Sequence, residues 1–167
     1  MRKPQVFFSL HFERDIYRAE QIRAMGIVEC NLFLPRDEWE KRKKMTGGVE
    51  KWIDASMRHR DCIIVLIGTE TAARPWVRYE IKKAWTDGMS IVGIYIHNIK
   101  DPRYEDCPPL HGKCIRGADP FAAIRLNNGM SLSHYVTCYD PNPRDSCMDI
   151  ASNLVTWIKN AAVISSS

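Results

Sequence analysis

Short apolar runs alternate along this chain with longer segments in which apolar residues recur every three or four positions. The runs are typical of β-strands, and the spaced segments are typical of amphipathic helices. Five runs are predicted as strands: QVFFSL at 5–10, IVECNLF at 27–33, CIIVLIG at 62–68, SIVGIYI at 90–96 and YVTCY at 135–139. The third run does not alternate with polar residues, which indicates a strand covered on both faces, as in a central parallel sheet.

Four helices are predicted among these strands. Gly26 ends the first, and the third begins near Pro75, because proline is favoured at the first helical position. The last begins at Ser146, with Asp149 three residues later in a capping-box pattern. The packed faces are predicted to be Ile16, Ala19, Ile22 and Met25; Val49, Trp52, Ile53 and Ser56 or Met57; Val77, Ile81, Ala84 and Trp85; and Cys147, Ala151, Leu154, Val155 and Ile158.

Alternation of strands and helices implies right-handed crossovers and a parallel sheet with helices on both faces. We therefore predict a flavodoxin-like α/β fold with five parallel strands in the order 2-1-3-4-5. A single domain over residues 1–167 is expected, with an irregular, insertion-like segment at about 98–133 that contains a short helix around 120–126. Residues 34–48, LPRDEWEKRKKMTGG, are predicted to form a polar loop.

The composition is that of a soluble globular protein, with 45% hydrophobic and 26% charged residues among 167. The longest apolar run, at 62–67, is too short to cross a bilayer, so no membrane partner is expected. The first residues do not resemble a secretory signal, which predicts a cytoplasmic location and reduced thiols for the six cysteines. A formal charge of +4 does not by itself indicate a nucleic-acid partner.

In such sheets, ligands bind beyond the carboxyl ends of the strands, where the strand order reverses. That point lies between the first and third strands of the predicted order. The segments that follow these strands would bring together Ser9, His11, Phe12, Asp15, Trp76, Tyr79 and Glu80, and the loop after the second strand would add Asp37 and Trp39. Trp76 and Glu80 share a helix face at the border of the packed stripe. The alternative is that Glu80 is a solvated acid and Trp76 only packs.

Three stretches together resemble the TIR-like proteins of the bacterial Thoeris antiphage system, within the Toll/interleukin-1 receptor (TIR) superfamily. They are VFFSLHFERDIYRAEQIR, VEKWIDASMRHRDCIIVLIGTETAARPWVRYEI and IVGIYIHNIKD, and the similarity covers about residues 5–101. The resemblance implies chemistry on NAD+ as a substrate, with no other cofactor, and an essential glutamate at the position of Glu80. It also implies that residues 9–15, including Leu10, contribute to the nucleotide pocket and that the region of Asp37 and Trp39 covers it.

By the same resemblance, the chain would break the nicotinamide–ribose bond and make an ADP-ribose-derived messenger of the cyclic kind that activates a separate effector. Assembly into a homo-oligomer and a phage-derived trigger are implied as well. The sequence leaves open whether the product is a cyclic isomer, linear ADP-ribose or a conjugate. An alternative from another class is a non-catalytic TIR-like module that works by protein–protein assembly.

Other motifs bear on other functions, and each of them is a weaker signal than the resemblance. Cys107, His111 and Cys114 lie close together and could hold zinc, but no second pair with the usual spacing follows. The basic run within EKRKK, 40–44, could attract phosphates or form a solvated loop. The segment GTETAARP lacks the Walker lysine and the G-x-G-x-x-G spacing, which disfavours a Rossmann-type redox enzyme. Gly68 stands where a receiver domain would have its phosphorylated aspartate.

Overall fold

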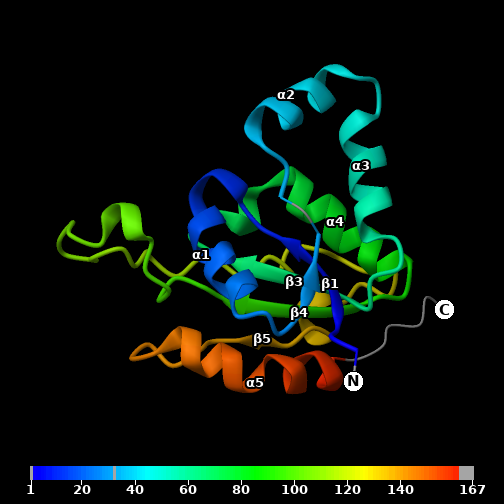
Figure 1. Cartoon of the computed structure of the whole chain (residues 1–167). Coiled ribbons are helices and arrows are strands. Elements are labelled where there is room, and N and C mark those ends of the chain that lie inside the picture. Colours follow the sequence, from blue (N-terminus) through cyan, green and yellow to red (C-terminus); the bar gives the residue numbers. More distant parts are fainter. Residues whose placement is uncertain (1, 32, 162–167) are drawn as a thin grey trace.

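A five-stranded parallel sheet forms the centre of the molecule, as Figure 1 shows for the computed structural model, which describes residues 2–31 and 33–161. The strand order is β2-β1-β3-β4-β5. The strands are β1 Gln5–Ser9, β2 Glu29–Cys30, β3 Cys62–Ile67, β4 Ser90–Tyr95 and β5 Cys138–Tyr139. The predicted α/β fold and its strand order are therefore confirmed, although the two edge strands are shorter than the apolar runs that predicted them.

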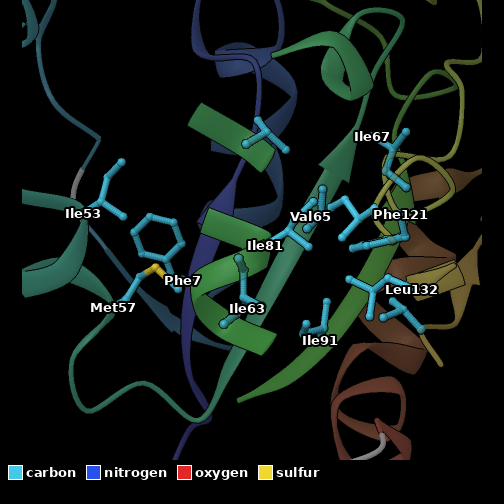
Figure 2. Packing of buried hydrophobic residues seen from close by; sticks show 14 of the residues in the cluster. Phe7, Ile53, Met57, Ile63, Val65, Ile67, Ile81, Ile91, Phe121 and Leu132 are labelled. Atoms are coloured by element: carbon cyan, nitrogen blue, oxygen red, sulfur yellow. The ribbon is translucent and has the colours of Figure 1, made fainter. Parts of the chain in front are cut away.

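Helices cover both faces of the sheet. They are α1 Phe12–Ala24, α2 Arg36–Lys44, α3 Gly48–Met57, α4 Pro75–Thr86 and α5 Ser146–Asn160, with 3-10 turns at Thr71–Ala73, Pro102–Tyr104 and Leu132–His134. All six residues of β3 are buried, and successive side chains point to opposite faces. On one face Ile63 and Val65 pack with α3 and α4, as Figure 2 shows. On the other face Ile64 and Leu66 pack with α1 and α5.

One helix, α2, lies within the segment that the sequence analysis predicted as a polar loop. None of its residues is buried, so hydrophobic periodicity could not reveal it. The charged residues of α2 account for the formation of this helix instead. Acidic residues in the first turn and basic residues in the last turn complement the helix dipole. Pairs three or four positions apart also lie within ion-pair distance, including Lys43 and Glu40 at 3.6 Å.

Two local predictions were wrong. Residues 120–126 form turns rather than a short helix, and Phe121 enters the core from this irregular segment. The cap of α5 is Asp145 rather than Ser146, because the Asp145 carboxylate accepts a hydrogen bond from the Met148 amide at 3.0 Å. The Asp149 carboxylate instead accepts a hydrogen bond from the amide of Asn142.

A buried ion pair replaces apolar contacts on part of α1. Asp15 and Arg18 are 2% and 5% exposed, and their charged groups lie 2.9 Å apart. Arg18 also donates hydrogen bonds to the carbonyl oxygens of Ile99 at 2.8 Å and Gly112 at 2.7 Å. A side chain at Gly68 would collide with the Asp15 carboxyl group, so the chain leaving β3 passes directly over it. The pair thus connects α1 with the segments that follow β3 and β4.

We predict that Arg18→Met lowers the free energy of unfolding by about 3–5 kcal/mol, because it leaves the Asp15 carboxyl group buried without its partner. Urea unfolding followed by circular dichroism measures this difference. Arg2→Met is the matched control, since Arg2 pairs with Asp61 at the surface and such pairs contribute at most about 1 kcal/mol. Equal losses in the two variants would contradict the role given to Arg18.

Candidate active site

A cavity of about 370 Å³ lies at the carboxyl end of β1, between the first turns of α4 and the segment that follows β2. This is the switch point of the strand order, where the sequence analysis placed a site. Its walls are largely apolar. They comprise Phe7, Phe8, Leu10, His11, Phe12, Glu13, Ile16, Asn31, Phe33, Leu34, Arg36, Trp39, Trp52, Arg74, Trp76, Val77 and Glu80.

The loop after β3 sets the start of α4 and therefore the position of the residues on it. The Gly68 amide donates a hydrogen bond to the Thr71 hydroxyl at 2.8 Å, which turns the chain at the end of the strand. Pro75 then begins the helix. Val77 and Ile81 pack against the sheet, and Glu80 follows at the border of this buried stripe. The side chain of Glu80 is consequently buried rather than exposed to solvent.

Glu80 is a buried acid with little to compensate its burial. It is 8% exposed, and its Oε2 accepts a hydrogen bond from the Ser9 hydroxyl at the end of β1. Loss of hydration raises the pKa of Glu80 to about 8, while the hydrogen bond from Ser9 opposes this change. No salt bridge to Glu80 occurs within the described residues. At pH 7 this carboxyl group is therefore mostly neutral.

Aromatic side chains from three helices meet edge to face beside Glu80. The ring centroids of Trp39 and Trp76 lie 6.2 Å apart, and those of Trp39 and Trp52 lie 6.3 Å apart. Such pairs stabilise by about 0.5–1.5 kcal/mol beyond the area that they bury. Trp39 belongs to α2, Trp52 to α3 and Trp76 to α4, so this contact joins the otherwise solvated α2 to the body of the protein.

A second aromatic group lies in the cavity wall near the start of α1. The ring of Phe33 lies 6.4 Å from that of Phe8 and 6.3 Å from that of Phe12. Asn31 supports this wall, because its side-chain oxygen accepts a hydrogen bond from the Phe8 amide at 2.8 Å. The cavity therefore offers flat apolar faces to a ligand along more than one wall.

The structure brings most of the predicted site residues to this cavity. Six of them line it, namely Leu10, His11, Phe12, Trp39, Trp76 and Glu80, and Ser9 contacts Glu80. The structure does not place Asp15, Asp37 or Tyr79 in the wall. Asp15 is engaged by Arg18, Asp37 is exposed in the first turn of α2, and the Tyr79 hydroxyl donates a hydrogen bond to Asp54 at 2.9 Å.

Several lining residues were not predicted from the sequence. Asn31 had a usable signal, since it is a polar residue inside an apolar run. Arg36 and Arg74 had none, because each precedes or begins a helix and resembles an ordinary surface charge. Trp52 was assigned to the packed face of its helix, and it does pack there while also reaching the cavity.

Neither a metal centre nor a membrane-spanning helix is found in the part of the chain that the structure describes. Within residues 2–31 and 33–161, no three histidine, cysteine or acidic side chains are grouped so that they could hold an ion. Cys107 is exposed, and the His111 ring lies 3.3 Å from the carbonyl oxygen of Glu105. No helix in these two ranges combines the length and the apolar character that crossing a bilayer requires.

Comparison with known proteins gives two matches. The family described as "Thoeris protein ThsB, TIR-like domain" matches residues 7–101, which include the last three residues of β1, all of β3 and β4, and Glu80. A protein of Bacillus cereus (strain MSX-D12) named "Putative cyclic ADP-D-ribose synthase ThsB1" is 33% identical over 109 residues. The alignment covers 58% of this chain and 54% of that protein, so the chain spans about half the length of this curated relative. The family match covers more than half of the residues of this chain. The chain therefore belongs to the TIR-like domain family of the Thoeris protein ThsB.

Proposed function

We propose that this protein cleaves the nicotinamide–ribose bond of NAD+ and forms a cyclic ADP-ribose-type product. The observation that carries the proposal is the buried Glu80 carboxyl group, which lies in the wall of an aromatic cavity and whose only side-chain hydrogen bond among residues 2–31 and 33–161 is with the Ser9 hydroxyl. Burial of an acid without a counter-ion opposes folding, and such groups concentrate at functional sites. The family and the name of the Bacillus cereus relative support the choice of substrate.

The proposed reaction breaks the bond between the ribose C1′ and the ring nitrogen of nicotinamide. The bonding electron pair goes to that nitrogen, so nicotinamide leaves as a neutral molecule and positive charge develops on the ribose. No general acid is needed for this departure. A carboxylate at position 80 would stabilise the developing cation across a cavity with largely apolar walls, where a fixed charge acts more strongly than in water.

The pKa of Glu80 and the charge of the substrate are linked in this proposal. Burial raises the pKa of Glu80 to about 8. The nicotinamide ring of NAD+ carries a positive charge, and a nearby cation favours the ionised form of an acid. Binding of NAD+ would therefore promote loss of the Glu80 proton and produce the carboxylate where the reaction needs it.

The fate of the ribose cation determines the product. Attack by water gives ADP-ribose and a proton. Attack by a ring nitrogen of the adenine in the same molecule gives a cyclic ADP-ribose instead. Trp39, Trp76 and Phe12 supply apolar faces that exclude water and can stack on a folded-back adenine. These walls favour the cyclic product.

In the cell, we propose that this product diffuses to a separate effector in the cytoplasm. Self-assembly of the protein and a phage-derived trigger would control when the cavity becomes competent. This part of the proposal rests on membership of the Thoeris family.

We predict that Glu80→Gln reduces nicotinamide release from NAD+ by about 100- to 1,000-fold, the loss typical of removing one electrostatic stabiliser. Glutamine keeps the shape and the hydrogen bond with Ser9 but cannot carry the negative charge. Chromatography of the reaction mixture measures nicotinamide directly. Glu105→Gln, which removes an exposed carboxyl group, serves as the control and should retain full activity. Unchanged turnover in Glu80→Gln would refute the assignment.

The dependence of kcat/KM on pH gives a second test, because this ratio reports ionisation of the free enzyme. If the carboxylate is required, kcat/KM should rise about tenfold per pH unit and level off above a pH of about 8. Burial lowers the pKa of His11 from 6.5, so the midpoint of its titration lies below the interval from 6.5 to 8. A flat profile over that interval would contradict the proposed role of the ionised form.

The folding stability of the protein should also depend on the ionisation of Glu80. It should fall as the pH rises, whereas kcat/KM should increase. Between pH 4.5 and about 8 the acid is ionised in the unfolded chain and neutral in the folded protein. Folding of the wild type therefore becomes less favourable as pH rises, by up to about 1.4 kcal/mol per unit. Relative to wild type, Glu80→Gln should gain stability across this range in urea unfolding. A stability difference that is the same at both ends of the range would disprove the burial penalty.

A further inference from the structure

Two arginines from different elements line the cavity. Arg36 begins α2, and Arg74 immediately precedes α4. Neither forms a salt bridge with a carboxylate among the residues that the structure describes. The acid nearest in sequence to Arg74, Glu70, is paired with Arg14 at 2.6 Å. Both arginines are exposed to solvent, and Glu13 is the other acidic residue besides Glu80 that lines this cavity. A bound anion would give the two positive charges a partner.

The N-terminus of α4 faces the same cavity. This helix has 12 residues, begins with proline, and no side chain caps its first turn. Trp76 and Val77, both in that first turn, line the cavity. Amide groups at the start of a helix have no partner within the helix, and the helix dipole adds partial positive charge there. Phosphate groups bind readily to such a terminus.

A buried polar side chain without a partner lies in the same wall. His11 is 6% exposed, and its Nδ1 has no hydrogen-bond partner in the described structure. Burial and the neighbouring Arg74 both lower the pKa of His11, so the ring is neutral at pH 7. A neutral imidazole donates one hydrogen bond and accepts another. His11 therefore presents a buried ring nitrogen that no described residue engages and that a ligand in the cavity could use for a hydrogen bond.

From these three observations we infer that Arg36, Arg74, His11 and the N-terminus of α4 form a diphosphate-binding subsite. The inference rests on the proposed function and names the residues that would hold the diphosphate of NAD+. Trp76 and Glu80 are four residues apart, a rise of about 6 Å along the helix. One sugar ring separates the phosphate of a nucleotide from its glycosidic bond. The subsite and the Glu80 carboxyl group are therefore spaced so that a held diphosphate presents the scissile bond to Glu80.

The test measures binding and does not require turnover. The parent is Glu80→Gln, and the double variant adds Arg36→Met and Arg74→Met to it. We expect calorimetry to show that the double variant binds ADP-ribose about 10- to 100-fold more weakly than the parent, because charge-assisted hydrogen bonds are lost. Binding of inorganic pyrophosphate should weaken similarly, and binding of adenosine should not change. The affinity of the parent for ADP-ribose should also fall as salt is raised, and that of the double variant should fall less.

Arg78→Met in the same parent is the matched control, because Arg78 is an exposed arginine one turn further along α4 and does not line the cavity. Its affinity for ADP-ribose should equal that of the parent. Arg36→Lys with Arg74→Lys keeps the charges and should restore part of the affinity, which a defect in folding would not allow. Thermal unfolding of each variant checks that the fold is intact.

The outcomes separate this inference from the proposed function. Equal ADP-ribose affinity in the parent and the double variant would overturn the subsite, even if wild type releases nicotinamide. So would a parent that binds adenosine as tightly as ADP-ribose. Loss of pyrophosphate and ADP-ribose affinity in the double variant would support the subsite, even if wild type released no nicotinamide and the proposed reaction therefore failed.

Discussion

The contact between Glu80 and Ser9 is the constraint on which the site depends. It joins the second turn of α4 to the end of β1 and keeps a carboxyl group inside an apolar cavity. Buried acids oppose folding unless charges or several hydrogen bonds compensate them. Here one hydroxyl does so only in part, and the pKa of Glu80 is raised to about 8. The buried acid therefore destabilises the fold, and a cationic substrate bound beside it would offset this destabilisation.

The rest of the structure holds this costly contact in place. A fully buried β3 and the packed stripe of α4 set the depth of the helix, and the hydrogen bond from Gly68 to Thr71 sets its start. Behind this loop, the Asp15–Arg18 pair connects α1 with the segment after β4. By contrast, α2 has no buried residue and is held to the body through the ring of Trp39. The central sheet and the packed face of α4 thus position the acid, and α2 lines one side of the cavity through Arg36 and Trp39.

The sequence predicted those features that depend on hydrophobic spacing. The uninterrupted apolar run at 62–67 identified the central strand, and the stripe through Val77 and Ile81 placed Glu80 at the edge of a packed face. It did not reveal α2, which is stabilised by charge pairs and by complementarity with its dipole. It also missed the buried Arg18, because a charged residue is expected at the surface unless its partners are known. Arg74 was missed for a related reason, since only the three-dimensional structure shows that it faces the cavity.

The most direct test of the account is a crystal structure of the Glu80→Gln variant with NAD+ bound, because the variant preserves the shape of the site and should leave the substrate intact. The account predicts that the nicotinamide-bearing ribose lies against the side chain at position 80 and near the Ser9 hydroxyl, within the cavity between β1 and α4. A dinucleotide bound at another surface, or bound here with that ribose turned away from position 80, would contradict it.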